Sequence, residues 1–257
     1  RYTKLKMSKI IAVTGKGVTG KTTFAGLIIR ALLDKRCGAV LAVDADPNST
    51  LAETLGLKVE DTISSICEET LKAKENLPAG MAKDRYLEYR MQQSLLEKDS
   101  LSVLSMGRPE GPGCYCYVNN LLREMIKDLI DDYTYTVIDN EAGMEHLSRK
   151  TMRKIDILFV VSDFSVIGVR SAARIYNLAC AMGIKLGKSF LIVNKAKDGI
   201  QGLDKEIQNS GLTFAGTLPF DQEIEKASLD GKSLFDLPQE SSAVKNINRI
   251  IKEVVLS

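Results

Sequence analysis

The segment from residue 15 to residue 23 carries glycines, lysines and threonines whose spacing suits phosphate binding. Gly20, Lys21 and Thr22 form its end, which follows an apolar run and directly precedes a helix-like stretch at 24–33. Small residues in such a loop let backbone N–H groups close around phosphates at the helix N-terminus. Lys21 would neutralise phosphate charge, and the Thr22 hydroxyl would ligate Mg²⁺. The pattern therefore predicts a nucleoside triphosphate site made by Gly15, Lys16, Gly17, Val18, Thr19, Gly20, Lys21, Thr22 and Thr23.

Three aspartates follow two other apolar runs and could face the same nucleotide. Asp44 and Asp46 stand after the first of these runs, about where the γ-phosphate and the attacking water would lie. Asp46 precedes Pro47, so it could merely cap the next helix, and this role is compatible with the first. Asp139 ends the second run in the form of a Walker B aspartate, which would hold Mg²⁺ through water. Gly143 would let the following loop move when the γ-phosphate is present.

The choice of base depends on Asn194 and Lys195, which follow another apolar run. A guanine-reading Asn-Lys-x-Asp pattern needs an aspartate at its fourth position, where this chain has Lys197. The sequence therefore predicts ATP rather than GTP. Asp198 stands one position late and leaves GTP open as the second choice.

Cys114 and Cys116 place two thiols two residues apart, before an amphipathic helical pattern at 118–130. In extended backbone, residues i and i+2 project from one face with Cα atoms roughly 6.5 Å apart, so the thiols could converge on one metal. A two-fold dimer would join both pairs into a four-sulfur site. Zn²⁺ fits a tetrahedral site of this kind, whereas Ni²⁺ prefers a planar one. Two small buried residues would explain the same pair without a metal.

These residues must be positioned by strands and helices that alternate along the chain. The pattern predicts an α/β fold, a three-layer doubly wound sheet of about seven mostly parallel strands with helices on both faces. Ligands bind at the carboxyl ends of strands in such sheets, so Gly15, Asp46 and Asp139 should converge on one site. The strand-like runs lie at 9–14, 39–44, 101–106, 135–139, 157–162, 190–194 and 214–218.

The chain of 257 residues is long enough for one large core, and we expect a single P-loop ATPase domain at 7–257. Residues 1–6 precede Met7 and are set aside as an addition to the natural start. The segment 58–100 is a charged helical insertion, either a solvated face or a docking surface. Apolar residues at helical spacing in 243–255 predict a last helix against the sheet.

Composition limits the classes of partner. The net charge of +2 gives no general attraction to nucleic acid or to an anionic membrane, and no apolar run reaches the roughly 18 residues of a membrane span. No signal peptide opens the sequence, so we expect a cytoplasmic protein with no nucleic-acid or membrane partner. The five cysteines are expected to be reduced thiols, because they form no even disulfide framework.

Lys16 is a residue that an ordinary phosphate-binding loop does not need. It makes the loop resemble the deviant Walker A motif of the MinD and ParA-type ATPases, which use this lysine across a dimer. That family usually has glycine where this chain has Val18. A β-branched residue tolerates positive φ poorly, so Val18 either keeps an ordinary backbone angle or strains the loop. The resemblance implies a nucleotide-linked homodimer in which Lys16 and Lys21 are catalytic.

The same resemblance assigns roles to later residues. It gives Asp46 the task of orienting the attacking water, with Asp44 close to Mg²⁺ or to its water ligands. It also makes the turn at Leu218, Pro219 and Phe220 the wall of the adenine pocket that faces the Asn-Lys pair. That turn could also simply end a strand.

With the cysteine pair included, the chain resembles the CooC-type nickel-insertion ATPases and their relative AcsF. The resemblance covers nearly all residues from Met7 onward and depends on the segments 14–17, 43–47, 114–116 and 142–147. It implies an ATP-hydrolysing, Mg²⁺-dependent homodimer that holds Ni²⁺ or Zn²⁺ through Cys114 and Cys116. Its client would be carbon monoxide dehydrogenase or acetyl-CoA synthase.

A partitioning or positioning ATPase of the MinD/ParA type is the alternative. Membrane-binding members carry a basic amphipathic helix at the C-terminus, but residues 252–257 have little basic character. DNA-binding members would need a clustered basic face, which the near-neutral charge disfavours. A biosynthetic amidotransferase or synthetase that shares the loop is a third reading, disfavoured because no second catalytic domain is evident.

Overall fold

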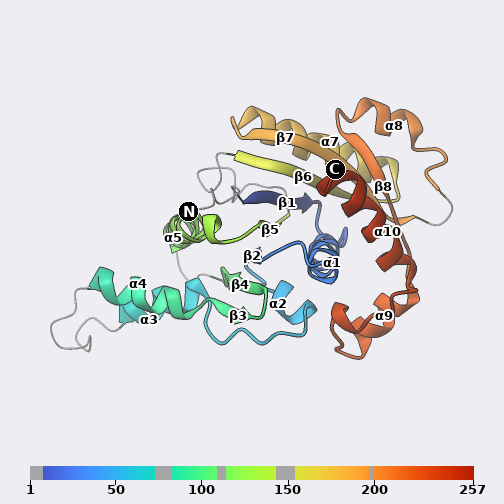
Figure 1. The fold of residues 1–257 in the computed structure, drawn as a ribbon. Helices are drawn as coiled ribbons and strands as arrows, with labels where there is room; N and C mark the ends of the chain where they lie inside the picture. The colour runs from blue at the N-terminus through green and yellow to red at the C-terminus, as the bar shows by residue number, and fades with distance from the viewer. Residues whose placement is uncertain (1–7, 73–82, 109–113, 143–153, 197–198) are drawn as a thin grey trace, which may run out of the picture.

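The computed structural model describes residues 8–72, 83–108, 114–142, 154–196 and 199–257. Within them, one eight-stranded sheet has the order β3-β4-β2-β5-β1-β6-β7-β8, and helices cover both of its faces (Figure 1). Every neighbouring pair is parallel except β3 and β4. The predicted α/β fold with a mostly parallel sheet is confirmed. The strands are β1 (Lys9–Gly15), β2 (Val40–Ala45), β3 (Leu96–Lys98), β4 (Leu101–Ser105), β5 (Tyr135–Asn140), β6 (Lys154–Asp163), β7 (Lys185–Ala196) and β8 (Thr213–Pro219).

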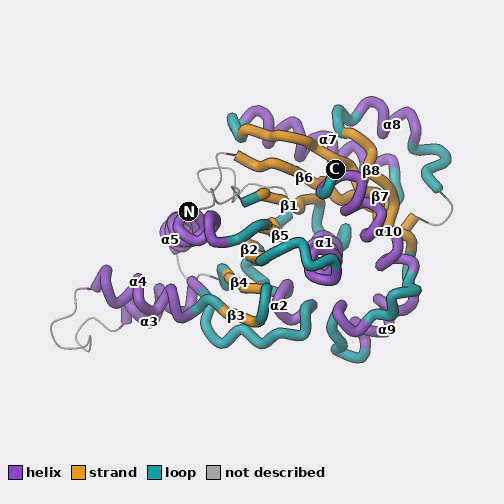
Figure 2. Tube along the Cα trace, viewed as in Figure 1, coloured by secondary structure: helices purple, strands orange, loops and turns teal. Residues whose placement is uncertain are grey.

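Helices alternate with most of these strands (Figure 2). The last helix continues as a π-helical turn at Ile251–Val255, and the two together match the helix predicted at 243–255. Short 3-10 turns lie at Ile130–Asp132 and Leu234–Asp236. The described α-helices are α1 (Lys21–Asp34), α2 (Leu51–Thr54), α3 (Ile63–Lys72), α4 (Lys83–Gln93), α5 (Cys114–Leu129), α7 (Val166–Ala181), α8 (Asp204–Asn209), α9 (Gln222–Leu229) and α10 (Ser242–Ile250).

Neighbouring positions on one strand enter different layers of the core. Ile11 and Val13 of β1 pack in the layer of α1 and α10, while Ala12 between them packs in the layer of α7. On β2, Leu41 and Val43 pack with α3, α4 and α5 on that second face. A parallel strand covered on both faces has no polar side, which explains the continuous apolar runs in the sequence.

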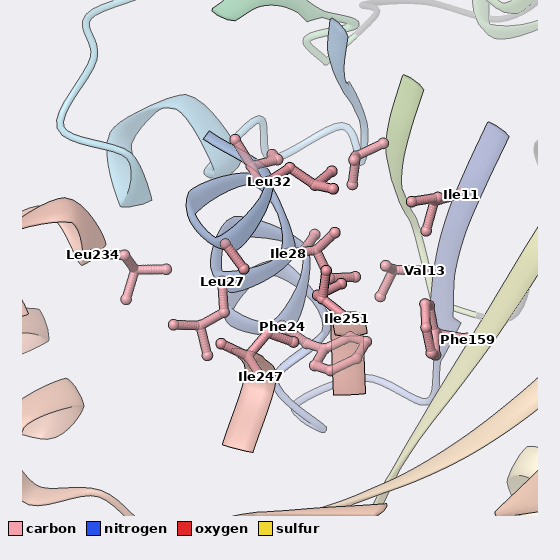
Figure 3. Close-up of a cluster of buried hydrophobic side chains, with 14 of the residues drawn as sticks. Ile11, Val13, Phe24, Leu27, Ile28, Leu32, Phe159, Leu234, Ile247 and Ile251 are labelled. Carbon is pink, nitrogen blue, oxygen red and sulfur yellow. The ribbon is translucent and has the colours of Figure 1, made fainter. Parts of the chain in front are cut away.

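Helix α1, which follows the segment 15–23, is held firmly by the first of these layers (Figure 3). Phe24 is fully buried, and its ring meets that of Phe159 on β6 edge to face, with centroids 5.2 Å apart. Leu27 and Ile28 continue the buried face one turn later. Because packing fixes the helix axis against the sheet, the N-terminus of α1 has a fixed position at the carboxyl end of β1.

The sequence missed one strand, β3 at Leu96–Lys98, which pairs antiparallel with β4 at the sheet edge. It has three residues, two of them exposed, too few for an alternating pattern. It ends the segment 58–100, whose helical prediction holds for α3 and α4. These two helices lie side by side beyond the sheet (Figure 1), where Arg90 of α4 pairs with Glu69 (2.7 Å) and Asp61 (3.1 Å).

Candidate nucleotide-binding site

The segment 15–23, called here the phosphate loop, joins the end of β1 to the start of α1. Gly15 lies so close to the Val161 carbonyl of β6 that a Cβ atom would collide with it. Gly20 begins α1 with a φ of 85°, and a Cβ atom there would collide with the side-chain amide of Asn194. Within the described part of the chain, no side chain caps α1. Its first N–H groups are therefore left for an anion at the positive end of the helix dipole.

One carbonyl fixes the curvature of the phosphate loop. The Lys16 carbonyl oxygen accepts hydrogen bonds from Thr19 Oγ1 (2.8 Å) and from Lys21 Nζ (3.4 Å). Gly17 and Val18, which follow Lys16, are exposed, and Val18 has a φ of 66°. Of the two possibilities foreseen for Val18, the structure has the strained one, because a β-branched residue at positive φ is an outlier.

Lys21 and Asp139 form a buried charged centre beneath the phosphate loop, with exposures of 8 % and 1 %. Neither carboxylate oxygen of Asp139 has a hydrogen-bond partner of proper geometry among the described residues. Burial raises the pKa of Asp139 to about 6, although the nearby Thr22 hydroxyl and Lys21 ammonium act to lower it. A buried carboxylate with no well-formed hydrogen bond, beside a threonine hydroxyl, fits a hard cation such as Mg²⁺. Thr22 and Asp139 are therefore the residues that would hold it.

Asp44 lies beside Asp139 because β2 and β5 pair these two residues in register. Burial, and then the charge of Asp139, raise the pKa of Asp44 to about 7. Its Oδ2 accepts from the Leu51 amide (2.8 Å), and its Oδ1 accepts from the Asp46 amide (3.2 Å). Asp44 therefore fixes the segment after β2, and its role near Mg²⁺ stays a prediction.

Asp46 is half-buried in that segment and holds a tight turn. Its Oδ1 accepts from the backbone amide and the side-chain amide of Asn48, both at 2.9 Å. Helix α2 begins at Leu51, and the amide of Leu51 is bound by Asp44. The interpretation of Asp46 as only a helix cap is therefore wrong, while its action on water stays a prediction.

The raised pKa values of the two buried carboxyl groups predict that the folded protein becomes less stable as pH rises toward neutral. Asp139 and Asp44 have folded-state pKa values raised to about 6 and about 7, so the folded protein holds more protons than the unfolded chain above about pH 4. The free energy of unfolding of the nucleotide-free protein should therefore fall as pH rises from about 4 to about 7. Asp139→Asn should remove about 2 kcal/mol of this fall, measured by urea unfolding across that range. Equal slopes in both proteins would contradict the assignment.

A pocket of about 310 Å³ opens beside the start of α1. Asn194 joins this pocket to the phosphate loop, because its Nδ2 donates to the Thr19 carbonyl (2.8 Å) while its Oδ1 accepts from the Lys195 amide (2.9 Å). The structure thus brings the predicted base residues together with the phosphate loop in one continuous site. Its wall includes Asn194, Lys195, Leu218, Pro219 and Phe220.

Sequence reasoning missed a third wall of this pocket, which α9 supplies. The residue that could have indicated α9 in the sequence is Asp221, a residue type that commonly caps helices. Its carboxylate caps α9 by accepting from the Glu223 amide (2.9 Å), and it also accepts from the Ala243 amide (2.8 Å) at the start of α10. Burial acts to raise its pKa, but these amides and two serine hydroxyls lower the pKa of Asp221 to about 2. One carboxylate therefore orients two helices beside the pocket. The α9 residues in the wall are Ile224, Glu225, Ser228 and Leu229.

Cys114 and Cys116 fall in the first turn of α5 and not in an extended loop before it. The argument that extended backbone turns both thiols to one face is therefore wrong, since residues two apart on a helix do not face each other. No glycine or proline separates Cys114 from the apolar face that begins at Val118, so the helix extends back to it. The two side chains lie outside the described residues, and metal ligation stays a prediction.

Other predictions concern segments that the structure does not describe. Gly143 of the loop after β5 and Asp198 after β7 lie outside the described residues. Among the residues that are described, no group of three or more His, Cys, Asp or Glu side chains could hold a metal ion. Those residues also contain no helix long and apolar enough to cross a membrane.

Comparison with known proteins places the chain in a family. The family described as the CobQ/CobB/MinD/ParA nucleotide binding domain matches residues 10–235. An uncharacterised ATP-binding protein of Methanocaldococcus jannaschii is 43 % identical over 249 residues, which cover 96 % of this chain and 98 % of that protein. The carbon monoxide dehydrogenase accessory protein CooC of Rhodospirillum rubrum is 31 % identical over 241 residues, which cover 88 % of this chain and 89 % of that protein.

A solved structure gives the same fold. The septum site-determining protein MinD of Pyrococcus horikoshii, complexed with Mg-ADP, superimposes with a TM-score of 0.70 at 21 % identity, over 96 % of each chain. The phosphate loop, the two buried aspartates and the base pocket up to α9 all lie within the matched residues 10–235. The chain is therefore a P-loop nucleotide-binding protein that belongs to the CobQ/CobB/MinD/ParA family.

Proposed function

We propose that this protein is a cytoplasmic ATPase that dimerises with ATP and metal and supports nickel insertion into carbon monoxide dehydrogenase or acetyl-CoA synthase. The ATPase part is carried by one observation, the buried Lys21 ammonium and the buried Asp139 carboxylate, whose oxygens have no hydrogen bond of proper geometry among the described residues, at the phosphate loop. The accessory role is supported by the 31 % identity to CooC of Rhodospirillum rubrum and by the pair Cys114 and Cys116.

In the proposed reaction, the phosphate loop binds and orients ATP. The amides at the start of α1 and the Lys21 ammonium hold the phosphates. Thr22 and Asp139 would hold Mg²⁺, which when bound neutralises charge on the phosphate oxygens. Asp46 orients the attacking water, and Lys16, exposed on the loop, reaches the nucleotide of the partner. Hydrolysis of ATP then returns the protein from the ATP-bound dimer to its starting state.

Asp46→Asn should slow single-turnover hydrolysis by about a hundredfold while ATP still binds, because an amide cannot serve as the carboxylate that orients water. The variant should accumulate as a nucleotide-loaded dimer. Asn48→Ala is the matched control, since it removes only one of the two donors to Asp46 Oδ1 and should cost much less. Hydrolysis by Asp46→Asn near the wild-type rate would remove Asp46 from the mechanism.

The metal in this proposal is cargo, held by Cys114 and Cys116 of both subunits as Ni²⁺ or Zn²⁺. Because both cysteines lie in the first turn of α5, the turn must open before their two thiols can bind the same metal ion. The first four N–H groups of a helix make no intrahelical hydrogen bond, so opening the first turn of α5 would cost only the bonds that the carbonyls of residues 114–116 accept from residues 118–120. A position near a helix N-terminus also favours the thiolate form that binds metal.

Activation of a nickel-free client enzyme tests the function directly. Nickel-deficient carbon monoxide dehydrogenase, incubated with Ni²⁺, Mg-ATP and this protein, should gain carbon monoxide oxidation activity faster than with Ni²⁺ alone. The same assay with acetyl-CoA synthase identifies which client is served. Equal activation with and without the protein, for both clients, would reject the accessory role.

A partitioning or positioning ATPase remains the second candidate, favoured by the fold shared with MinD of Pyrococcus horikoshii. It makes a different prediction, because such a protein must bind a large anionic surface when loaded with ATP. Sedimentation with DNA or with anionic vesicles in the presence of ATP would support it. The net charge of +2 gives no such attraction by itself.

A further inference from the structure

Helix α9, which supplies the third wall of the base pocket, has little packing of its own. Of its eight residues, Ala227 is the buried one. A surface helix is stabilised mainly by the apolar face that it buries, so α9 depends on what holds its two ends. At the first end, the Asp221 carboxylate accepts from amides at the starts of α9 and α10. The position of this wall therefore depends also on what holds the other end.

Residues 233–237 follow α9 and lie against α1. The chain turns back toward them at Lys232, whose amide donates to the Ala227 carbonyl near the end of α9 (2.8 Å). Leu234 is buried, and a Cβ atom added at Gly26 of α1 would lie 2.7 Å from Leu234 Cδ1. Figure 3 shows Leu234 on the side of α1 that faces away from β1. The segment 233–237 therefore joins the end of α9 to α1.

Arg30 of α1 holds this segment with a buried guanidinium, and the residue is 3 % exposed. Its Nη1 donates to the Leu234 carbonyl (2.6 Å), and its Nη2 donates to the Leu237 carbonyl (2.7 Å). Its Nε lies at a longer 3.4 Å from the half-buried Asp34 carboxylate. An apolar side chain of similar size would often stabilise such a buried position at least as well. The guanidinium differs because its donors are fixed in one plane, so it sets the positions of both carbonyls at once.

We propose that Arg30 is a positioning residue for the base pocket, and that its two hydrogen bonds to residues 233–237 fix α9 where it lines the nucleotide base. This inference rests on the proposed binding of ATP and assigns to it a residue outside the pocket wall. Phe24 and Ile28 pack α1 into the core, so α1 is the fixed partner and α9 is the helix set in place. Lys21 lies about 14 Å from Arg30 along α1, so the phosphate loop does not depend on these two bonds.

Arg30→Met tests this role, because methionine fills apolar space but donates no hydrogen bond. ATP affinity should fall by about tenfold, since the nucleotide must then order the loosened wall of the pocket when it binds. The affinity for inorganic tripolyphosphate, which has the phosphates of ATP but no base, should stay unchanged. Isothermal titration in Mg²⁺ measures both affinities. Arg30→Lys, whose ammonium can still donate to one carbonyl, should lose less ATP affinity and gives the same comparison where Arg30→Met does not fold.

Ile28→Ala is the matched control for lost stability. Ile28 is fully buried on the same helix, so a cavity there destabilises the fold while the Leu234 and Leu237 carbonyls keep their donor. It should leave the ratio of ATP affinity to tripolyphosphate affinity unchanged, and amide hydrogen exchange in α9 should quicken in the Arg30 variants but not in Ile28→Ala.

Two results would count against the inference in different ways. Arg30 variants that lose ATP and tripolyphosphate affinity equally, or that lose neither, overturn the positioning role of Arg30 and leave ATP binding in place. A wild-type protein that binds ATP no more tightly than tripolyphosphate overturns the base pocket together with this inference.

Discussion

Lys21→Ala is expected to lower ATP affinity by at least about a hundredfold, equal to about 3 kcal/mol. Lys21 is 8 % exposed, and among the residues that the structure describes its ammonium makes one long hydrogen bond, to the Lys16 carbonyl at 3.4 Å. A buried ammonium so weakly partnered gains most of its stabilisation from the phosphates themselves. The ammonium also acts favourably on the buried Asp139 carboxylate, so the nucleotide-free variant should lose some stability, but far less than it loses in ATP affinity. Isothermal titration with ATP and thermal unfolding without it measure the two effects separately.

Lys16→Ala is the matched control for this change, because it removes the other lysine of the same loop. Lys16 is exposed, and its contribution to the loop comes from its backbone carbonyl, which alanine keeps. The variant should bind ATP nearly as the wild type does but should lose ATP-dependent dimerisation and hydrolysis. Undiminished dimer formation by Lys16→Ala would refute the cross-dimer role, and tight ATP binding by Lys21→Ala would refute the phosphate site.

Replacement of Cys114 and Cys116 by serine is expected to abolish metal binding. The reduced wild-type protein should bind about one Ni²⁺ or Zn²⁺ per dimer through four sulfurs, because two thiolates from each chain complete a four-coordinate site. The double variant should also dimerise less tightly, since a bridging metal links the subunits. X-ray absorption spectroscopy of the metal-loaded protein identifies the ligand atoms of the metal. ATP should alter this spectrum if the nucleotide site and the metal site are coupled.

Cys180→Ser provides the control for this experiment. Cys180 is an exposed free cysteine on α7, so its loss tests whether any accessible thiol would serve. It should leave metal stoichiometry unchanged. A Cys114→Ser and Cys116→Ser double variant that keeps stoichiometric, sulfur-ligated Ni²⁺ would eliminate the proposed site. A wild-type protein that binds no metal would favour the partitioning function.

The sequence by itself determined the phosphate loop, because its chemistry depends on residues within nine positions of one another. Gly20 and Lys21 must stand where a helix starts, and the apolar runs on either side supply the strand and the helix. The alternation of apolar runs likewise predicted the parallel sheet, since burial on both faces leaves a continuous signal. The same logic failed for β3, where three residues at an edge carry no pattern.

Only the tertiary structure decided which groups meet across the chain. Asp44 and Asp139 lie side by side because β2 and β5 pair them in register. Asp44, and not Asp46, accepts the hydrogen bond from the Leu51 amide at the start of α2, so the prediction that Asp46 caps this helix was wrong. The α9 wall of the base pocket is set by Asp221, which links two helices. These outcomes depend on hydrogen bonds and packing between segments far apart in sequence, whereas a motif records only local spacing. The left-handed backbone of Val18 was likewise visible only in the structure, because the sequence left an ordinary angle and a strained one both open.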